Sequence, residues 1–359
     1  MGMLGLSQLL ITKAFWGDCI DLFVKWVGNY GWAIILLTIA IKLVLTPLDI
    51  MQKRVNAKNA KMQAIMQPEL LKVQEQFPGD RNKLNQKQME LARKYNFNMT
   101  GTCLTLLISM IITLVVFTSL FTGINSLSKK QENIAFNEIY QTYQQAVVYT
   151  VDNSQDFLVE GGTEIDEAKV NTYIAKQVEA KFEEQSDKYS FMWVKNVWKG
   201  DKTISPVVSY KSFEKYAIKN GIISNTDAEK AEFKEDYNTI KAIIEEDNKN
   251  NGYYLLIILA GVITFLVQFL QVKLQERKTG VKNPSAKTML IIMPIFMLIF
   301  ASTSSALFTL YIITNSIMSA LISTITDLFM PKDKGNKEEV VYKKGNTEVV
   351  EYSRNYKKG

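Results

Sequence analysis

The sequence contains no histidine. Its absence excludes a histidine general base, a Ser-His or Cys-His nucleophile pair and a histidine-ligated zinc site. The sequence also shows no glycine-rich phosphate loop and no internal repeat. No cofactor is therefore expected, and the chain is not predicted to be an enzyme.

Cysteine is scarce as well. Cys19 and Cys103 are the two cysteines, and they form no metal-binding spacing and indicate no disulfide framework. Both lie in apolar surroundings, where a small buried thiol is the expected role. The residues before Cys19 read FWGD, which does not resemble a lipoprotein cleavage site.

Several long stretches lack charge. A membrane-spanning helix needs about 20 mostly apolar residues, and residues 32–48, 101–122 and 253–272 are candidates. Residues 288–326 carry no charge and are too long for one span, unless a single tilted helix has a buried end. The stretch ASTSS at 301–305 is a natural turn, so the sequence predicts five spans, the last two at 288–302 and 305–326.

The first predicted span contains one charge. Residues 33–48 read AIILLTIAIKLVLTPL, with Lys42 near the middle. A charged side chain there costs roughly 3 kcal/mol on insertion scales. Two interpretations are open: Lys42 snorkels along its stem toward the end of the span near Leu48, or it faces a wet cavity inside a helix bundle.

Loop charges orient the spans. The loop at 49–100 carries a net charge of +5, whereas the loop at 123–252 carries −6. By the positive-inside rule, residues 49–100, 273–287 and 327–359 are predicted to be cytoplasmic. The N-terminus and residues 123–252 are then outside, and residues 1–31 are expected to hold an amphipathic helix in the outer membrane interface.

The aqueous regions are predicted to be helical. Residues 49–100 show an amphipathic stripe interrupted at Pro68, a PGD turn and a second helical stretch, which predict a helical hairpin. An ordinary solvated pair of helices and a mobile arm that handles a partner are both compatible with this pattern. Residues 123–252 are long enough for a small domain, with helix starts predicted at TEID, where Thr163 is the expected N-cap, and at TDAE, residues 226–229.

The predicted fold class is therefore an all-α polytopic membrane protein. It has a five-helix transmembrane bundle, a cytoplasmic helical hairpin and a mainly helical extracytoplasmic insert. Several of its stretches resemble YidC-type membrane protein insertases in the right order. These are WAIILLTIAIKLVLTPLDIMQKRVNAKNAKMQAIMQPELLKVQEQF, RNKLNQKQMELARKYNFNMTGTCLTLLISM, FMWVKNVW, IMPIFMLIF and LYIITN.

The resemblance implies a bundle that encloses a hydrophilic groove, open to the cytoplasm and to lipid. Lys42 stands where the family usually has arginine, so the charge is kept but the planar five-donor fork is lost. Thr38 matches a family threonine, and Tyr311 falls at a functional aromatic. Ser109 lies in a span that lacks the family's usual glutamine and proline. The expected groove residues are Lys42, Thr38, Ser109, Gln268, Tyr311 and Asn315.

The function implied by the resemblance is insertion of hydrophobic segments of newly made proteins into the bilayer. The expected partners are nascent membrane proteins and membrane lipids, with the ribosome and the general secretion channel as further candidates and no specific nucleic acid. The chain is expected to act as a monomer in the bacterial plasma membrane, with its C-terminus in the cytoplasm. A secondary transporter or channel is the alternative, but such proteins generally carry acidic or paired ionisable residues at membrane depth.

Overall fold

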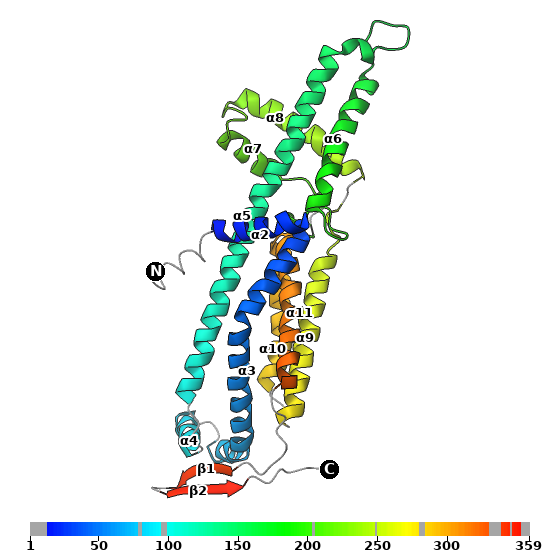
Figure 1. Ribbon diagram of the computed structural model, residues 1–359. Helices are drawn as coiled ribbons and strands as arrows, with labels where there is room; N and C mark the ends of the chain where they lie inside the picture. The colour runs from blue at the N-terminus through cyan, green and yellow to red at the C-terminus, as the bar shows by residue number, and fades with distance from the viewer. Residues whose placement is uncertain are drawn as a thin grey trace, which may run out of the picture. The chain divides into compact units, whose positions relative to one another are not determined.

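The computed structural model describes residues 13–77, 81–94, 99–202, 205–247, 250–279, 284–329, 339–344 and 347–352. Most of these residues are helical, which confirms the predicted all-α polytopic fold (Figure 1). The elements are α2 (Lys13–Val27), α3 (Tyr30–Gln76), α4 (Arg81–Lys94), α5 (Met99–Asp152), η1 (Ser154–Phe157), α6 (Glu167–Tyr189), α7 (Tyr210–Lys219), α8 (Asp227–Asp247), α9 (Leu255–Thr279), α10 (Pro284–Thr303), α11 (Ala306–Phe329), β1 (Glu339–Lys344) and β2 (Thr347–Tyr352).

The chain divides into two compact units. Unit 1 comprises Met1–Ala40, Val116–Phe265 and Ile292–Ser316, and unit 2 comprises Ile41–Val115, Leu266–Ile291 and Ile317–Gly359. The long helices α3, α5, α9, α10 and α11 each contribute residues to both units.

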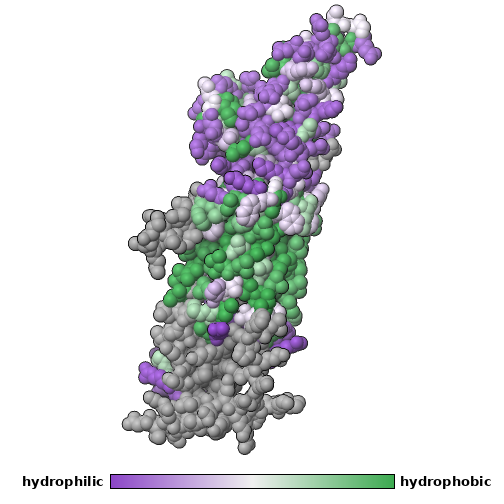
Figure 2. All heavy atoms as spheres, in the orientation of Figure 1, coloured by the Kyte–Doolittle hydropathy of each residue, from purple (hydrophilic) through white to green (hydrophobic). Residues whose placement is uncertain are grey.

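Four helical segments of the described chain are long and apolar enough to cross a membrane. They are Tyr30–Val55, Met110–Asp152, Leu255–Leu274 and Ala306–Asp327, and Leu290–Thr303 is a shorter apolar helix. The helices α10 and α11 are separate and meet at Ser304 and Ser305, within the predicted ASTSS turn. Figure 2 shows hydrophobic residues on the visible face of the apolar helices and hydrophilic residues over α6, α7 and α8.

Two helices continue past the positions where the sequence pattern suggested that they end. α3 passes through Pro47 and Pro68, so Pro68 does not interrupt it. α5 runs through residues 122 and 123, so the insert begins on the same helix as the second predicted span. The prediction of a hairpin at 49–100 is consistent with an ion pair between Lys94 on α4 and Glu69 on α3, with Nζ 2.9 Å from Oε1.

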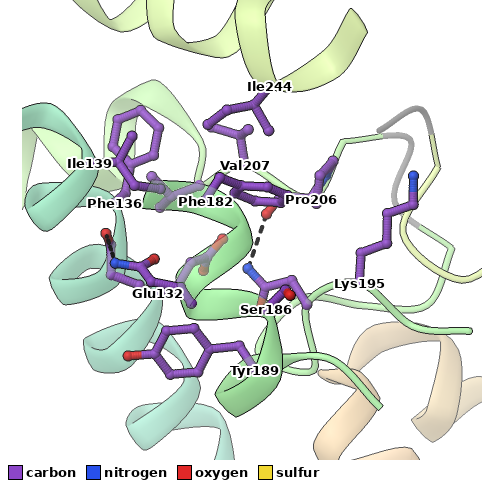
Figure 3. Close-up of a pocket in the computed structure, with 14 residues that line it drawn as sticks. Glu132, Phe136, Ile139, Phe182, Ser186, Tyr189, Lys195, Pro206, Val207 and Ile244 are labelled. Carbon is purple, nitrogen blue, oxygen red and sulfur yellow. Dashed lines mark hydrogen bonds between the residues drawn. The ribbon is translucent and has the colours of Figure 1, made fainter. Parts of the chain in front are cut away.

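The insert has its own hydrophobic core. α6, α7, α8 and the second half of α5 surround fully buried rings such as Phe213 and Phe233, which stack with centroids 5.0 Å apart. A cavity of about 30 Å³, enough for a water molecule, lies beside this core and is lined from α5, α6, α8 and the chain before α7 (Figure 3). Its small size indicates a packing gap beside this core, and its lining mixes apolar side chains with polar ones such as Glu132, Gln185 and Asn196.

The N-cap of α6 differs from the prediction. Asp166 is the cap, and its Oδ1 accepts the amides of Ala168 and Lys169 at 3.1 and 3.2 Å. Thr163 lies before the helix because the chain is still held in a hairpin, in which Leu158 and Ile165 pair as an isolated antiparallel bridge. At TDAE the helix start is confirmed, since α8 begins at Asp227.

Helix α2 lies across α5 in Figure 1. Trp16 is buried against α5, and its Nε1 donates a hydrogen bond to Ser119 Oγ at 2.7 Å. Other apolar side chains of α2 are exposed, including Trp26 at 73%. This arrangement matches an amphipathic helix lying in a membrane interface. Cys19 on α2 is a free thiol whose pKa is raised by burial and by Asp18, which disfavours the reactive thiolate.

The strands β1 and β2 pair antiparallel in the C-terminal tail, with Glu339 opposite Tyr352. The sequence analysis did not predict this hairpin, which is a short local exception to the helical fold.

Replacing Phe213 with alanine should destabilise the insert by about 3 to 5 kcal/mol, because it removes a fully buried ring that packs on Phe136 and Phe233. Tyr149→Ala, at an aromatic residue that is 44% exposed, is the matched control and should change stability far less. Limited proteolysis in detergent, followed by mass spectrometry, measures the opening of the insert. Equal protection of both variants would contradict the assignment of this core.

Candidate functional site

The cation inside the first apolar segment is paired within its own helix. Lys42 Nζ lies 3.5 Å from Asp49 Oδ2, and the two side chains are 13% and 32% exposed. Seven residues span about two turns, or roughly 10.5 Å, so both residues lie on one face of α3. The ammonium therefore sits displaced along its stem toward the end of the apolar segment, and the charge at Lys42 is neutralised locally.

Two threonine hydroxyls of α3 donate hydrogen bonds to backbone carbonyls near this pair. Thr38 is buried and donates to the carbonyl of Ile34 at 2.6 Å, and Thr46 donates to the carbonyl of Lys42 at 2.8 Å. Pro47 has no amide hydrogen to continue the helical ladder. In apolar helices, hydroxyls of this kind help to keep backbone groups near a proline satisfied, and α3 continues through Pro47.

A second lysine of α3 joins that helix to the last turns of α11. Lys53 Nζ lies 2.5 Å from Asp327 Oδ1 and donates to Ser323 Oγ at 2.9 Å and to the Ser323 carbonyl. The lysine thus approaches the C-terminal end of α11, where a positive charge is favoured by the helix dipole. This cluster holds α3 and α11 together within unit 2.

The other predicted groove residues divide between the two units. Tyr311 and Asn315 belong to unit 1 with Thr38, whereas Gln268 belongs to unit 2 with Lys42. Tyr311 is buried in an aromatic cluster, with its ring 5.3 Å from Phe308 and 6.4 Å from Phe117. Gln268 and Asn315 are half-buried. The side chain of Ser109 lies outside the described residues, and the convergence of the six on one groove stays a prediction.

The chain between α6 and α7 closes the N-terminal ends of two membrane helices. We call residues Ser190–Asp201 the plug. Its carbonyls of Lys199 and Val197 accept the amides of Ala306 and Leu307 at 2.6 and 2.9 Å, at the start of α11. The plug, which includes the stretch FMWVKNVW, therefore docks on the N-terminal end of α11, where the first amides of a helix have no partner within it.

Asp201 closes α9 in the same way. Its Oδ2 accepts the amides of Leu256 and Ile257 at 2.9 and 3.3 Å, and the side chain is buried. A Cβ atom at Gly252 would lie 1.7 Å from Asp201 Oδ1, so glycine is required at that position. Burial raises the pKa of Asp201, while the two backbone hydrogen bonds act in the opposite direction.

Aromatic rings fasten the plug to α3. Trp198 packs edge-on against Tyr30 at 4.2 Å, and Phe191 packs against Trp32 at 5.3 Å. Gly31 allows this approach, since a Cβ there would lie 2.2 Å from the Phe191 ring. The plug therefore contacts the first turns of three apolar helices, α3, α9 and α11.

One residue of the plug and two residues before α9 combine a positive φ with high exposure. Met192, Tyr253 and Tyr254 have φ angles of 54°, 58° and 63°, a region that non-glycine residues rarely occupy. The three side chains are 71%, 55% and 55% exposed. Exposed tyrosines at the end of an apolar helix are typical of the membrane interface.

Comparison with known families fits this architecture. A family model described as 60Kd inner membrane protein matches residues 22–333. The chain belongs to the 60Kd inner membrane protein family. This membership confirms the predicted resemblance to YidC-type proteins, and with the apolar helices it makes the chain a multi-pass bacterial membrane protein.

Individual relatives cover shorter stretches. A protein named Membrane protein insertase YidC from Nitratidesulfovibrio vulgaris is 44% identical over 91 residues, which are 25% of this chain and 16% of the relative. A protein of the same name from Fusobacterium nucleatum is 37% identical over 114 residues, or 32% of this chain and 54% of the relative. A third, from Polynucleobacter necessarius, is 39% identical over 117 residues, or 33% and 19%. The chain thus spans about half or less of the length of these relatives.

Sequence reasoning missed Asp49 and Asp201. Asp49 carried a signal, because its seven-residue spacing from Lys42 places both on one helix face, but the span was expected to end at Leu48. Asp201 carried no local signal, since the amides that it caps lie more than 50 residues further along the chain. Among the described residues, no three Cys, Asp or Glu side chains are grouped to hold a metal ion.

Asp201 should make stability depend on pH. Because its folded pKa is raised, the folded state holds a proton that the unfolded chain has released. The resulting stability is fully present below the ordinary pKa, about 4, and is lost as pH rises through the folded value. Asp201→Asn keeps an oxygen acceptor for Leu256 and Ile257 but does not titrate.

The measurement is the thermal unfolding midpoint in detergent between pH 4 and 8 for the parent and Asp201→Asn. Relative to the variant, the parent should lose stability as pH rises from about 4. The difference between the two curves removes the contribution of other carboxyls. Parallel curves would show that Asp201 has an ordinary pKa in the folded protein.

Proposed function

We propose that this protein inserts hydrophobic segments of newly made proteins from the cytoplasm into the bilayer. The observation that carries the proposal is a half-buried lysine in an apolar helix of a chain of the 60Kd inner membrane protein family. The same activity is stated in the names of the relatives, Membrane protein insertase YidC. Three parts of the molecule are assigned roles in this activity: Lys42, the plug and the α3–α4 hairpin.

Lys42 is the attractive element of the proposed groove. Thr38, Ser109, Gln268, Tyr311 and Asn315 are proposed to line the groove around it. An acidic tail that precedes the hydrophobic segment of a substrate is drawn toward the ammonium, while polar lining groups replace part of the water around the tail. The hydrophobic segment then moves sideways into lipid. No covalent chemistry is required for this route.

The plug is proposed to close the groove toward the outside. Its hydrogen bonds with the first amides of α9 and α11 support this role, because they leave no loose helix ends where it docks. The loop charges support the orientation, with the −6 insert outside and the +5 loop in the cytoplasm. A groove closed on one side keeps solutes from leaking while a substrate tail is held part-way across.

The hairpin of α3 and α4 is proposed to receive the substrate at the cytoplasmic surface. The ion pair of Lys94 and Glu69 joins its arms, with half-exposed partners that solvent can separate. The ribosome and the general secretion channel are candidate partners for this surface, alongside membrane lipids.

Lys42→Ala should slow insertion of substrates with acidic tails by about tenfold, because a charge attraction of about 1.4 kcal/mol is lost. Lys42→Arg should retain activity, since the charge is kept. Lys273→Ala, which removes an exposed lysine of α9, is the matched control. Insertion of a single-span protein into liposomes containing the purified protein gives the rates, and solute flux in the same liposomes tests the transporter alternative.

Stability must be measured first, because Lys42→Ala removes one partner of the Lys42–Asp49 ion pair, and breaking such a pair can destabilise the protein. Unchanged insertion of acidic-tailed substrates by a folded Lys42→Ala protein would remove the role proposed for the charge.

A further inference from the structure

Asp49 pairs with Lys42 although a second lysine of the same helix, Lys53, is closer in the sequence. Asp49 also lies four residues before Lys53, which is the favoured helical order for an acid and a base. Lys53 is instead engaged by Asp327 and Ser323 on α11. Asp49 consequently pairs back along the helix with Lys42, across the turn that contains Pro47.

The two partners differ in exposure. The Lys42 side chain is 13% exposed, whereas the Asp49 side chain is 32% exposed. Asp49 is the more exposed of the two and lies nearer the end of the apolar segment, so it is the partner that can leave the pair. An unpaired charge in the apolar segment would be strongly unfavourable. An arriving carboxylate can replace Asp49 without creating one, because Lys42 keeps a partner throughout.

We propose that Asp49 is a resident counter-ion of Lys42 and is displaced by a carboxylate of the incoming protein segment. The proposal rests on the insertase function given above and names its specificity-determining residue. A tail with one or more acidic residues opens the pair and is held by Lys42. A neutral tail leaves the pair closed and gains nothing from the lysine. Asp49 thus sets how acidic a tail must be to be captured.

The expected size of the effect follows from the competition. If Asp49 occupies Lys42 for most of the time, the apparent affinity for a substrate carboxylate is reduced by the fraction of free lysine. A partly exposed ion pair is weak enough for this reduction to be about threefold. Asp49→Asn should therefore raise the insertion rate of a substrate with a single tail carboxylate about threefold.

The test uses the full-length protein in liposomes and a single-span substrate with none, one or three aspartates in its tail. Asp49→Asn should accelerate the one-aspartate substrate and leave the neutral one unchanged. Lys42→Ala and the double variant Lys42→Ala with Asp49→Asn should behave alike, because the effect of Asp49 passes through Lys42. Glu276→Gln, which removes a carboxylate from the Lys273 pair on α9, is the control and should behave as the parent.

Other outcomes overturn the proposal. Equal rates for the parent and Asp49→Asn, with Lys42→Ala impaired, refute the exchange but leave the proposed insertase function intact. The same acceleration in the Lys42→Ala background shows a general surface-charge effect. If the parent inserts none of the substrates, the proposed function itself fails.

A charge-exchanged protein covers the case in which Asp49→Asn does not fold. Lys42→Asp combined with Asp49→Lys keeps a pair of opposite charges on the same helix face. It should favour substrates whose tails carry lysine over those with aspartate. A continued preference for acidic tails would refute the exchange.

Discussion

The structure depends on satisfying helix ends that have no water to bind them. α9 and α11 begin where the plug covers them, and their first amides find the carboxylate of Asp201 and the carbonyls of Val197 and Lys199. An unsatisfied amide in such a place would cost several kcal/mol. One continuous segment, Ser190–Asp201, thus fixes where both helices start, and its aromatic rings fix the start of α3 as well. The insert is coupled to the membrane helices through this segment and through the continuous helix α5.

The same constraint applies to charge further along α3. An isolated ammonium in an apolar helix is unfavourable, and the structure resolves it with Asp49 instead of with a distant helix. The sequence left two interpretations of Lys42 open, snorkelling toward the end of the span or facing a wet cavity, and the structure has a feature of the first. Lys42 extends along its stem toward the end of the segment, as snorkelling predicts, but it ends on a carboxylate instead of in bulk water. In the proposed function, this neutralised charge is the one that an incoming carboxylate takes over from Asp49.

Much of the fold followed from the sequence because apolar length is a local property. The spans were predicted from runs of mostly apolar residues, and the turn from the small polar residues ASTSS. Pro68 was overestimated as an interruption, since α3 gains enough from its long ladder to pass through a proline. Thr163 was chosen as a cap because T-x-x-D fits the capping pattern, yet the bridge of Leu158 and Ile165 delays the helix to Asp166. The contacts of Asp201 and of Lys53 join residues far apart in the sequence. No periodic pattern in the sequence reports such contacts, so they could not be predicted.

The identity of the cation follows from its partner. The family resemblance implies arginine at the position of Lys42, and arginine binds a carboxylate best when its planar fork meets both oxygens. A partner two turns away on the same helix offers one oxygen at the end of a long reach, as the 3.5 Å contact with Oδ2 shows. Lysine meets that oxygen with a compact charge at the end of a flexible stem. Lys42 and Asp49 are therefore best understood as one unit, in which the weaker, single-point contact of lysine makes the pair easier to open.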